Sequence, residues 1–263
     1  MGFSRGMRKA SLVGAFFVSA LLALPAQALC PAPVQLVEQR VAQVIDGDTL
    51  RLADGRSVRM IGLNTPERGR EGRAAEPFAE KATRHLRQLV EASDWHVRLW
   101  PGREAHDRYG RLLAHVYDRR GSNLEAEQLA AGLGYFVAVH PNTSLVECQR
   151  AAEQQARQAQ LGLWRQAPVV RPQALRQGGF AIVRARVERL ERNRGGIWLE
   201  LDGPLVLQVP ARQVEAFDVA ALQRLVGREV EARGWVVDRG RRKGASQARW
   251  LLRLSHPAML ERP

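Results

Sequence analysis

Short apolar runs separated by turn signals occupy residues 34 to 63, and this pattern constrains the fold more strongly than any other feature of the chain. Apolar and β-branched residues alternate with polar ones, and Asp46-Gly47-Asp48 and Asp54-Gly55 interrupt the runs. Alternation with a period of two is typical of strands, and an Asp-Gly pair between two such runs is a strong hairpin signal. The sequence therefore predicts a meander of short strands in this region.

The next hundred residues mix helical and strand patterns. The expected elements are a helix over 74–92, strands over 95–100 and 111–117, and a helix over 123–131. Ser144 and Glu147 have the spacing of a capping box, in which the two side chains satisfy free backbone N–H groups at a helix start. This motif predicts a third helix, ending near Leu161.

A second domain is predicted after residue 164. Residues 165–177 combine prolines with scattered arginines and precede Gly178-Gly179, a composition typical of a linker. Strand-like runs then restart, with one short helix near 219–225, and strands of this length suit a small five-stranded barrel. The expected fold class is mainly β with helices (α+β), with domains over 34–164 and 178–263.

The first 28 residues have the pattern of a secretory signal peptide. Three basic residues precede an apolar run over 12–24, and Ala26-Gln27-Ala28 follows as a cleavage motif. The run is too short and wrongly flanked for a transmembrane helix. Acylation at Cys30 is the weaker alternative because Leu29 is bulky. We therefore expect a periplasmic or secreted protein with no membrane attachment after cleavage.

The chain has two cysteines, Cys30 and Cys148. In an oxidising compartment they would be able to form a disulfide that ties the mature N-terminus to a helix. Two cysteines without flanking histidine motifs do not predict a zinc site.

The charge of the chain favours a polyanionic partner. The formal net charge is +13, and removing the leader, with three basic and no acidic residues, leaves +10. A basic excess of this size is typical of nucleic-acid-binding proteins, although a solvated basic surface is the alternative.

Three clusters carry the residues able to do chemistry: "VIDGDTLRL" from 44, "RMIGLNTPE" from 59 and "DRYGRLLAHVY" from 107. Asp46 and Asp48 are two apart, so their side chains share one face of an extended chain, where a cation would stabilise both charges. Hard oxygen ligands suit calcium or magnesium. The alternative is an ordinary Asp-Gly turn.

The second and third clusters indicate phosphate chemistry. Arg59 and Arg111 are candidates for a phosphate clamp, because a guanidinium donates two parallel hydrogen bonds and keeps its charge. Glu67 is a candidate general base that takes a proton from water, or else a carboxylate at a helix start. Tyr109 is expected either to hydrogen-bond a phosphate or to fill the barrel wall.

Together, the three clusters resemble the thermonuclease, or staphylococcal nuclease-like, family over about residues 34–164. The matching features are "IDGDT", an arginine eight residues before Glu67, and "DRYGR" some forty residues on, in that order. The resemblance implies a five-stranded barrel of the oligonucleotide-binding (OB) type with three helices. It also implies calcium-dependent hydrolysis of DNA and RNA to 3′-phosphorylated products.

The resemblance also assigns roles by position. Asp48 matches a metal-ligating carboxylate, Thr65 a backbone-carbonyl ligand and Asp46 an aspartate behind the ligands. Arg59 and Arg111 match the phosphate-binding arginines, Glu67 matches the general base, and Arg108 with Tyr109 match residues that hold a neighbouring phosphate.

Two positions depart from the family pattern. Asn64 stands where a second metal-ligating aspartate is usual; its amide oxygen is still able to bind calcium, but one negative charge is lost and affinity should fall. Val137 replaces a tyrosine that stacks on a base, which alters the expected base preference.

The C-terminal part resembles a second OB-type barrel more loosely. It is expected either to hold nucleic acid or to act as a packing module with a basic rim. The candidate nucleic-acid contacts are Arg233, Arg239, Arg241 and Arg242.

Two functions from different classes follow from the sequence. The first is a metal-dependent nuclease, acting as a monomer on DNA or RNA with Ca²⁺ as its cofactor. The second is a nucleic-acid-binding protein on a nuclease scaffold, whose metal site is too weak for turnover because of Asn64.

Overall fold

The computed structural model describes residues 2, 29–33, 36–69, 72, 74–166, 168–240 and 248–263. Apart from Gly2, the predicted signal peptide lies outside these residues. Within the described ranges, no helix combines the length and apolar character needed to cross a membrane.

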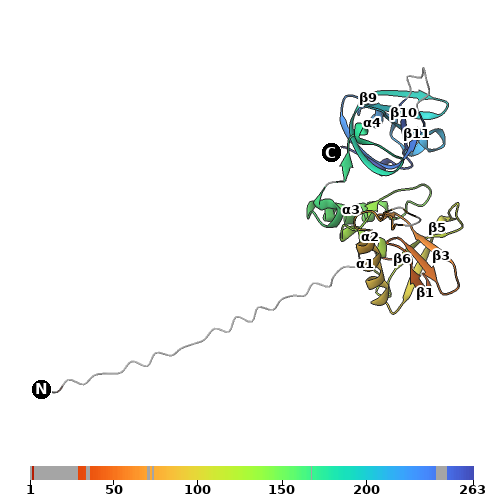
Figure 1. The fold of residues 1–263 in the computed structure, drawn as a ribbon, viewed down its shortest axis with the longest axis vertical. Helices are drawn as coiled ribbons and strands as arrows, with labels where there is room; N and C mark the ends of the chain where they lie inside the picture. The colour runs from red at the N-terminus through yellow and green to blue at the C-terminus, as the bar shows by residue number, and fades with distance from the viewer. Residues whose placement is uncertain are drawn as a thin grey trace.

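The N-terminal half contains a closed five-stranded barrel, called here the first barrel (Figure 1). Its strands pair in the order β1-β2-β3-β6-β5 and back to β1. Strands β3 and β6 are parallel, and the other neighbours are antiparallel. The bounds are β1 Val37–Val44, β2 Thr49–Leu52, β3 Ser57–Met60, β5 His96–His106 and β6 Leu112–Tyr117. This ring confirms the predicted meander and the OB-type barrel.

Three helices accompany the first barrel, as predicted: α1 Ala79–Glu91, α2 Leu124–Ala130 and α3 Val146–Gln158. The predicted start of α1 at residue 74 is wrong, because Phe78 has a left-handed φ of 73° that a helix does not continue through. The predicted capping box is also wrong: the N-cap of α3 is Leu145, and no side chain caps it. Asn123 does cap α2, accepting a hydrogen bond from the N–H of Ala126.

A disulfide joins Cys30 to Cys148 on α3, across 118 residues of sequence. Their Cα atoms are 5.6 Å apart, and Cys30 is buried in the core. The pairing expected from the sequence is therefore present, and it ties residues 29–33 to the first domain.

The C-terminal half contains the second barrel, which repeats the pairing order of the first. Strand β12 pairs with β9, so β9-β10-β11-β13-β12 forms a closed ring. Counted along the chain, the third and fifth strands of each barrel are the parallel pair, here β11 and β13. Helix α4 (Val219–Gln223) lies between the third and fourth strands, where the first barrel has α1. The bounds are β9 Gly179–Asn193, β10 Gly196–Leu201, β11 Leu205–Pro210, β12 Glu229–Asp238 and β13 Trp250–Arg253.

Several short elements link or flank the barrels. Strand β4 (Leu63–Asn64) pairs with β7 (Tyr135–Phe136) beside the first barrel. Strands β8 (Val169–Val170) and β14 (Leu260–Glu261) extend the second sheet. The 3₁₀ turns are η1 Gly162–Arg165, η2 Pro172–Ala174, η3 Ala211–Ala216 and η4 Pro257–Met259. Part of the predicted linker is thus paired with the second barrel, since Val169 lies opposite Ile182 of β9.

Helix α3 and the second barrel meet in a buried ion-pair network. Arg233 of β12 is 1% exposed, and its Nη1 donates to Oε2 of Glu153 on α3 at 2.5 Å. The prediction that Arg233 holds nucleic acid is therefore wrong, because the packing of α3 against β12 encloses it. Arg239 is partly buried, and Arg241 and Arg242 lie outside the described residues.

Candidate active site

Asp48 immediately precedes β2 and connects two loops of the first barrel. Its side chain is buried, and Oδ2 accepts hydrogen bonds from the N–H of Thr65 at 2.8 Å and from Thr65 Oγ1 at 3.0 Å. Oδ1 accepts from Thr49 Oγ1 at 3.0 Å, while the N–H of Asp48 donates to Oδ1 of Asp46 at 3.1 Å. These bonds bring Asp46, Asp48 and Thr65 together, although 17 residues of sequence separate Asp48 from Thr65.

Helices α1 and α2 contact the turn that carries Asp48 and fix its position. A Cβ on Gly47 would lie 2.7 Å from Cβ of Ala82 and 2.8 Å from Oγ1 of Thr65, so only glycine fits between α1 and the Thr65 loop. Gln128 of α2 donates from Nε2 to the carbonyl of Gly47 at 2.7 Å and to that of Ala82 at 3.0 Å. Gln128 therefore positions the turn next to Asp48. The sequence does not indicate this role, because a glutamine within a helix carries no signal of it.

Arg59 lies between the two predicted metal-ligating side chains. It sits on β3, opposite Thr49 of β2 and Leu113 of β6. Its Nη2 donates to Oδ1 of Asn64 at 3.1 Å, and the same guanidinium forms an ion pair with Asp48. The guanidinium thus bridges a buried carboxylate and a buried amide.

Three charged side chains influence the pKa of Arg59. Burial lowers this pKa to about 10. The carboxylate of Asp46 raises it, the guanidinium of Arg111 lowers it, and the carboxylate of Glu67 raises it. Arg59 is therefore a cation at neutral pH. The four charged groups from three separate sequence clusters occupy one electrostatic environment.

Arg111 is held by the turn that precedes β6. Its Nε donates to Oδ2 of Asp107 at 2.7 Å, and the N–H groups of Tyr109 and Arg111 both donate to Oδ1 of Asp107. Burial would raise the pKa of Asp107, but the hydrogen bonds from Arg111 and Tyr109 lower it below the ordinary value. Asp107 is thus a charged anchor for Arg111.

Tyr109 is 68% exposed, so it does not fill the barrel wall, which was one of its two expected roles. Its hydroxyl accepts a hydrogen bond from Nη2 of Arg108 at 2.6 Å. The guanidinium carbons of Arg108 and Arg111 lie 4.7 Å and 5.5 Å from the centre of its ring. The guanidinium groups of Arg108 and Arg111 therefore lie next to the exposed phenol of Tyr109.

The register of the parallel strands places the two arginines on the same face of the barrel, offset by two residues. Arg59 pairs with Leu113, and Arg111 lies two residues before Leu113, so both side chains point to the outer face of the barrel. Val58 and Met60, the neighbours of Arg59, are buried inside.

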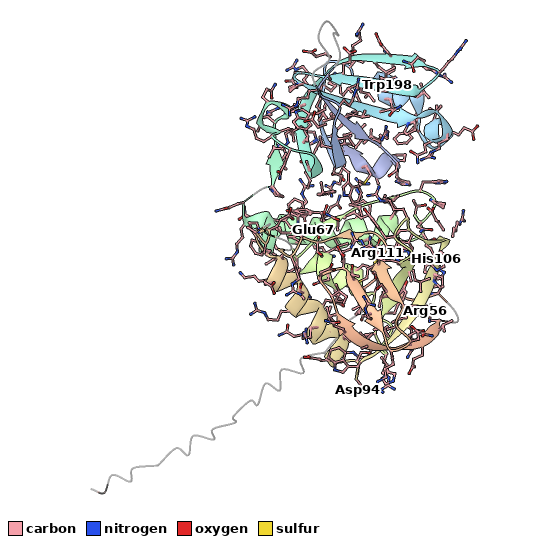
Figure 2. All side chains as sticks on the ribbon, turned by 45° about the vertical axis from the view of Figure 1, so that its right-hand side comes forward. Arg56, Glu67, Asp94, His106, Arg111 and Trp198 are labelled. Atoms are coloured by element: carbon pink, nitrogen blue, oxygen red, sulfur yellow. A yellow bond between two sulfur atoms is a disulfide. The ribbon has the colours of Figure 1, made fainter. Side chains whose placement is uncertain are left out.

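Glu67 follows Pro66 on an exposed loop and is not at a helix start, because α1 begins at Ala79. Its backbone is anchored: the N–H donates to Oε2 of Glu76 at 2.9 Å, and the carbonyl accepts from the N–H of Glu76 at 2.9 Å. Figure 2 shows Glu67 and Arg111 at the end of the first barrel that faces the second barrel. The helix-start alternative for Glu67 is therefore wrong.

The side chains of Asp48 and Asn64 offer oxygen atoms, which suit a hard cation, but together they carry only one negative charge. Asp48 and Asn64 bring a carboxylate and an amide oxygen to the same guanidinium, and oxygen donors of this kind bind calcium. Over the described part of the chain, no group of three or more His, Cys, Asp and Glu residues is arranged to hold a metal. A cation here would depend on one buried carboxylate supplemented by neutral oxygens.

Comparisons with known proteins identify the family of the first domain. The model of the family described as staphylococcal nuclease homologue matches residues 57–166. The thermonuclease of Staphylococcus hyicus is 34% identical over 129 residues, which are 48% of this chain and 74% of that protein. This chain belongs to the staphylococcal nuclease family.

Two other relatives of the chain are named as endonucleases. Endonuclease YncB of Bacillus subtilis is 31% identical over 134 residues, 49% of this chain and 63% of that protein. The prophage-derived endonuclease YokF of the same organism is 30% identical over 134 residues, 49% of this chain and 45% of that protein. The chain therefore spans less than two thirds of the length of these two relatives.

The structure locates one of the two departures from the family pattern. Val137, where the resemblance implies a base-stacking tyrosine, is 5% exposed and belongs to the hydrophobic core. It offers no surface to a base. Tyr135, two residues earlier on β7, is only partly buried.

Proposed function

We propose that the protein is a metal-dependent nuclease that hydrolyses phosphodiester bonds of DNA or RNA and leaves 3′-phosphorylated products. The observation that carries the proposal is that Arg59 of β3 and Arg111, just before β6, lie on the same outer face of the barrel, with Glu67 in the same electrostatic environment. Two cations beside a carboxylate suit a phosphodiester and its attacking water.

In this mechanism the arginines bind the phosphate and stabilise the charge that develops on its oxygens. Glu67 takes a proton from the attacking water, and the 5′-oxygen leaves. Asp48, Asn64 and the carbonyl of Thr65 would hold a divalent cation such as Ca²⁺, which supplies Lewis-acid stabilisation when bound. Asp107 keeps the Arg111 guanidinium in place throughout.

We propose a periplasmic or secreted location. The leader-like segment motivates it, and the Cys30–Cys148 disulfide supports it, because disulfides persist in oxidising compartments.

The competing proposal is a nucleic-acid-binding protein without turnover. One observation favours it: the predicted cation ligands Asp48 and Asn64 are both bonded to Arg59, and Asn64 brings no charge. A chain that binds nucleic acid but cleaves none at any metal concentration would establish this alternative.

The deciding experiment compares Glu67→Gln with wild type on single-stranded DNA in calcium. Loss of a general base should lower the rate about 10²- to 10⁴-fold, and a chelator should abolish cleavage by wild type. Glu91→Gln is the matched control, because Glu91 is exposed at the end of α1 and should leave the rate unchanged. Equal rates for Glu67→Gln and wild type would refute the role of Glu67.

A further inference from the structure

A large cavity extends from the candidate active site to the second barrel. Its volume is about 1460 Å³, and Asn64 and Glu67 line it on one side while Phe180 and Trp235 line it on the other. The cavity therefore reaches Glu67, a residue assigned to catalysis, yet eight of its 21 lining residues lie outside the family match at 57–166.

A ladder of aromatic rings follows the same path. Tyr135 lies opposite Asn64 in the β4–β7 pair, and its ring stacks on Phe180 with centres 5.1 Å apart. Phe180 lies opposite Trp235 in the β9–β12 pair, and these two rings meet edge to face at 5.5 Å. The strand registers thus carry aromatic surface from Asn64 to Trp235.

Trp235 is unusual in its exposure. Its side chain is 44% exposed, whereas Trp250 of the same barrel is 1% exposed and Trp164 is 5% exposed. A large ring left open on the wall of a cavity has surface available for a ligand. Tyr135 remains a neutral phenol, because burial raises its pKa to about 12, with Glu76 and Glu153 adding to the shift.

The charges on the wall indicate which part of a nucleic acid this cavity suits. Arg68 and Arg165 line it, but so do Glu67 and Glu76, and Arg68 is bonded to Glu80 and to the carbonyl of Ile45. The mixture does not form a positive track for phosphates, which have Arg59 and Arg111 instead. The flat rings suit the faces of bases, and only unpaired bases expose both faces for stacking.

We propose that this cavity is a subsite for unpaired bases of a single-stranded nucleic acid, with Trp235 and Phe180 as the stacking surface supplied by the second barrel. The inference rests on the proposed function, in that the strand lying here continues to the phosphate at Arg59 and Arg111. It gives the second barrel a role in choosing single-stranded over duplex substrate.

The test measures binding without cleavage on the full chain in chelator. The probe is a fluorescent oligothymidine of about 12 nucleotides, within the ~4–16 nucleotides that one such barrel covers, and its affinity is read by anisotropy. Trp235→Ala should weaken binding about 5- to 150-fold, the range of one lost base–aromatic stack. Trp235→Phe should regain most of the affinity, because it restores a ring.

Trp198→Ala is the matched control. Trp198 is a partly exposed tryptophan of β10 that does not line the cavity, and Figure 2 shows it toward the end of the second barrel away from the first. Its replacement should change affinity by less than about twofold. Thermal unfolding of each variant verifies that the barrel is intact.

The outcomes separate this inference from the proposed function. Equal affinities of Trp235→Ala and Trp198→Ala for the single strand would overturn the subsite, even if Glu67→Gln abolishes cleavage. An equal loss on a duplex of the same length would overturn the requirement for unpaired bases. Binding that depends on Trp235 in a chain that cleaves nothing would support the subsite and refute the nuclease.

Discussion

Arg59 donates a hydrogen bond from Nη2 to Oδ1 of Asn64 at 3.1 Å, and the same guanidinium pairs with Asp48. The side chain assigned to phosphate is thus bonded to both side chains assigned to the metal. Binding of a cation by Asp48 and Asn64 must therefore compete with Arg59 for their oxygens. In this chain the metal site and the phosphate clamp are coupled through one residue.

Asn64→Asp should tighten calcium binding about tenfold, because it adds a second carboxylate to a site that has one. Isothermal calorimetry on the full chain measures the effect. Asn193→Asp is the control, since Asn193 is exposed on the second barrel and uses only its Oδ1, which aspartate retains. If Asn64→Asp leaves the affinity unchanged, Arg59 has captured the new carboxylate.

Asp107→Ala should lower kcat/KM about tenfold or more, because Arg111 loses the partner that orients its guanidinium. Steady-state kinetics on single-stranded DNA measures this. Asp54→Ala removes a similar carboxylate, bonded to Arg56 at 2.8 Å on the exposed β2–β3 turn, and should leave kcat/KM unchanged. A similar loss in both variants would show that the effect is not specific to Arg111.

The pKa of Asp107 also predicts a pH dependence of stability. A folded-state pKa below the ordinary value of 3.8 means that the charged form is favoured by folding. The contribution of Asp107 is complete above that value and is lost as the pH falls through the lowered pKa. The difference in Tm between wild type and Asp107→Ala should therefore narrow below pH 3.8. A constant difference down to low pH would contradict the ion pair.

Glu153→Ala should lower the free energy of unfolding by about 3–5 kcal/mol, because it removes the nearest carboxylate from the buried Arg233, whose other partners, Glu231 and Glu261, lie at 3.4 Å and 4.0 Å. Adding Arg233→Met to Glu153→Ala should recover part of the loss, since no buried charge then remains unpaired. Urea unfolding measures both. Glu200→Ala removes the exposed partner of Arg189 and should cost no more than about 1 kcal/mol. Equal costs at the two sites would mean that the Arg233 pair is hydrated.

Reduction of the Cys30–Cys148 disulfide should lower stability by roughly 2–5 kcal/mol, the usual range for a native bridge in a secreted domain. Thermal unfolding with and without reductant measures the change. A Cys30→Ser, Cys148→Ser variant should unfold at the temperature of the reduced protein and ignore reductant. Reductant that shifts this variant as well would point to another cause.

Local patterns predicted much of the fold. The alternation in 34–63 became β1, β2, β3 and β4, and the helical period produced three helices, because these elements depend on residues two to four positions apart. The predicted capping box is wrong because it rested on a short motif: Ser144 and Glu147 have the right spacing, but α3 begins at Val146. Motifs of four residues are too common to locate a helix end alone.

The sequence also predicted the candidate site residues, through the order of three clusters, but it did not predict their contacts. Asp48 and Thr65 are 17 residues apart, and the parallel register of β3 and β6, which sets Arg59 and Arg111 on the same face of the barrel, has no local signature. Arg233 is expected from the sequence to contact nucleic acid, yet it is 1% exposed, because the sequence of a strand does not indicate what packs on each of its faces.

By itself, then, the sequence determined the strands, the helices and the set of charged residues available for phosphate chemistry, because these depend on neighbouring residues. Only the tertiary structure decided that Arg59 bridges Asp48 and Asn64, and that Tyr135, Phe180 and Trp235 form one ladder across two barrels. Those relationships depend on how the two barrels close and pack against each other, which no local pattern encodes.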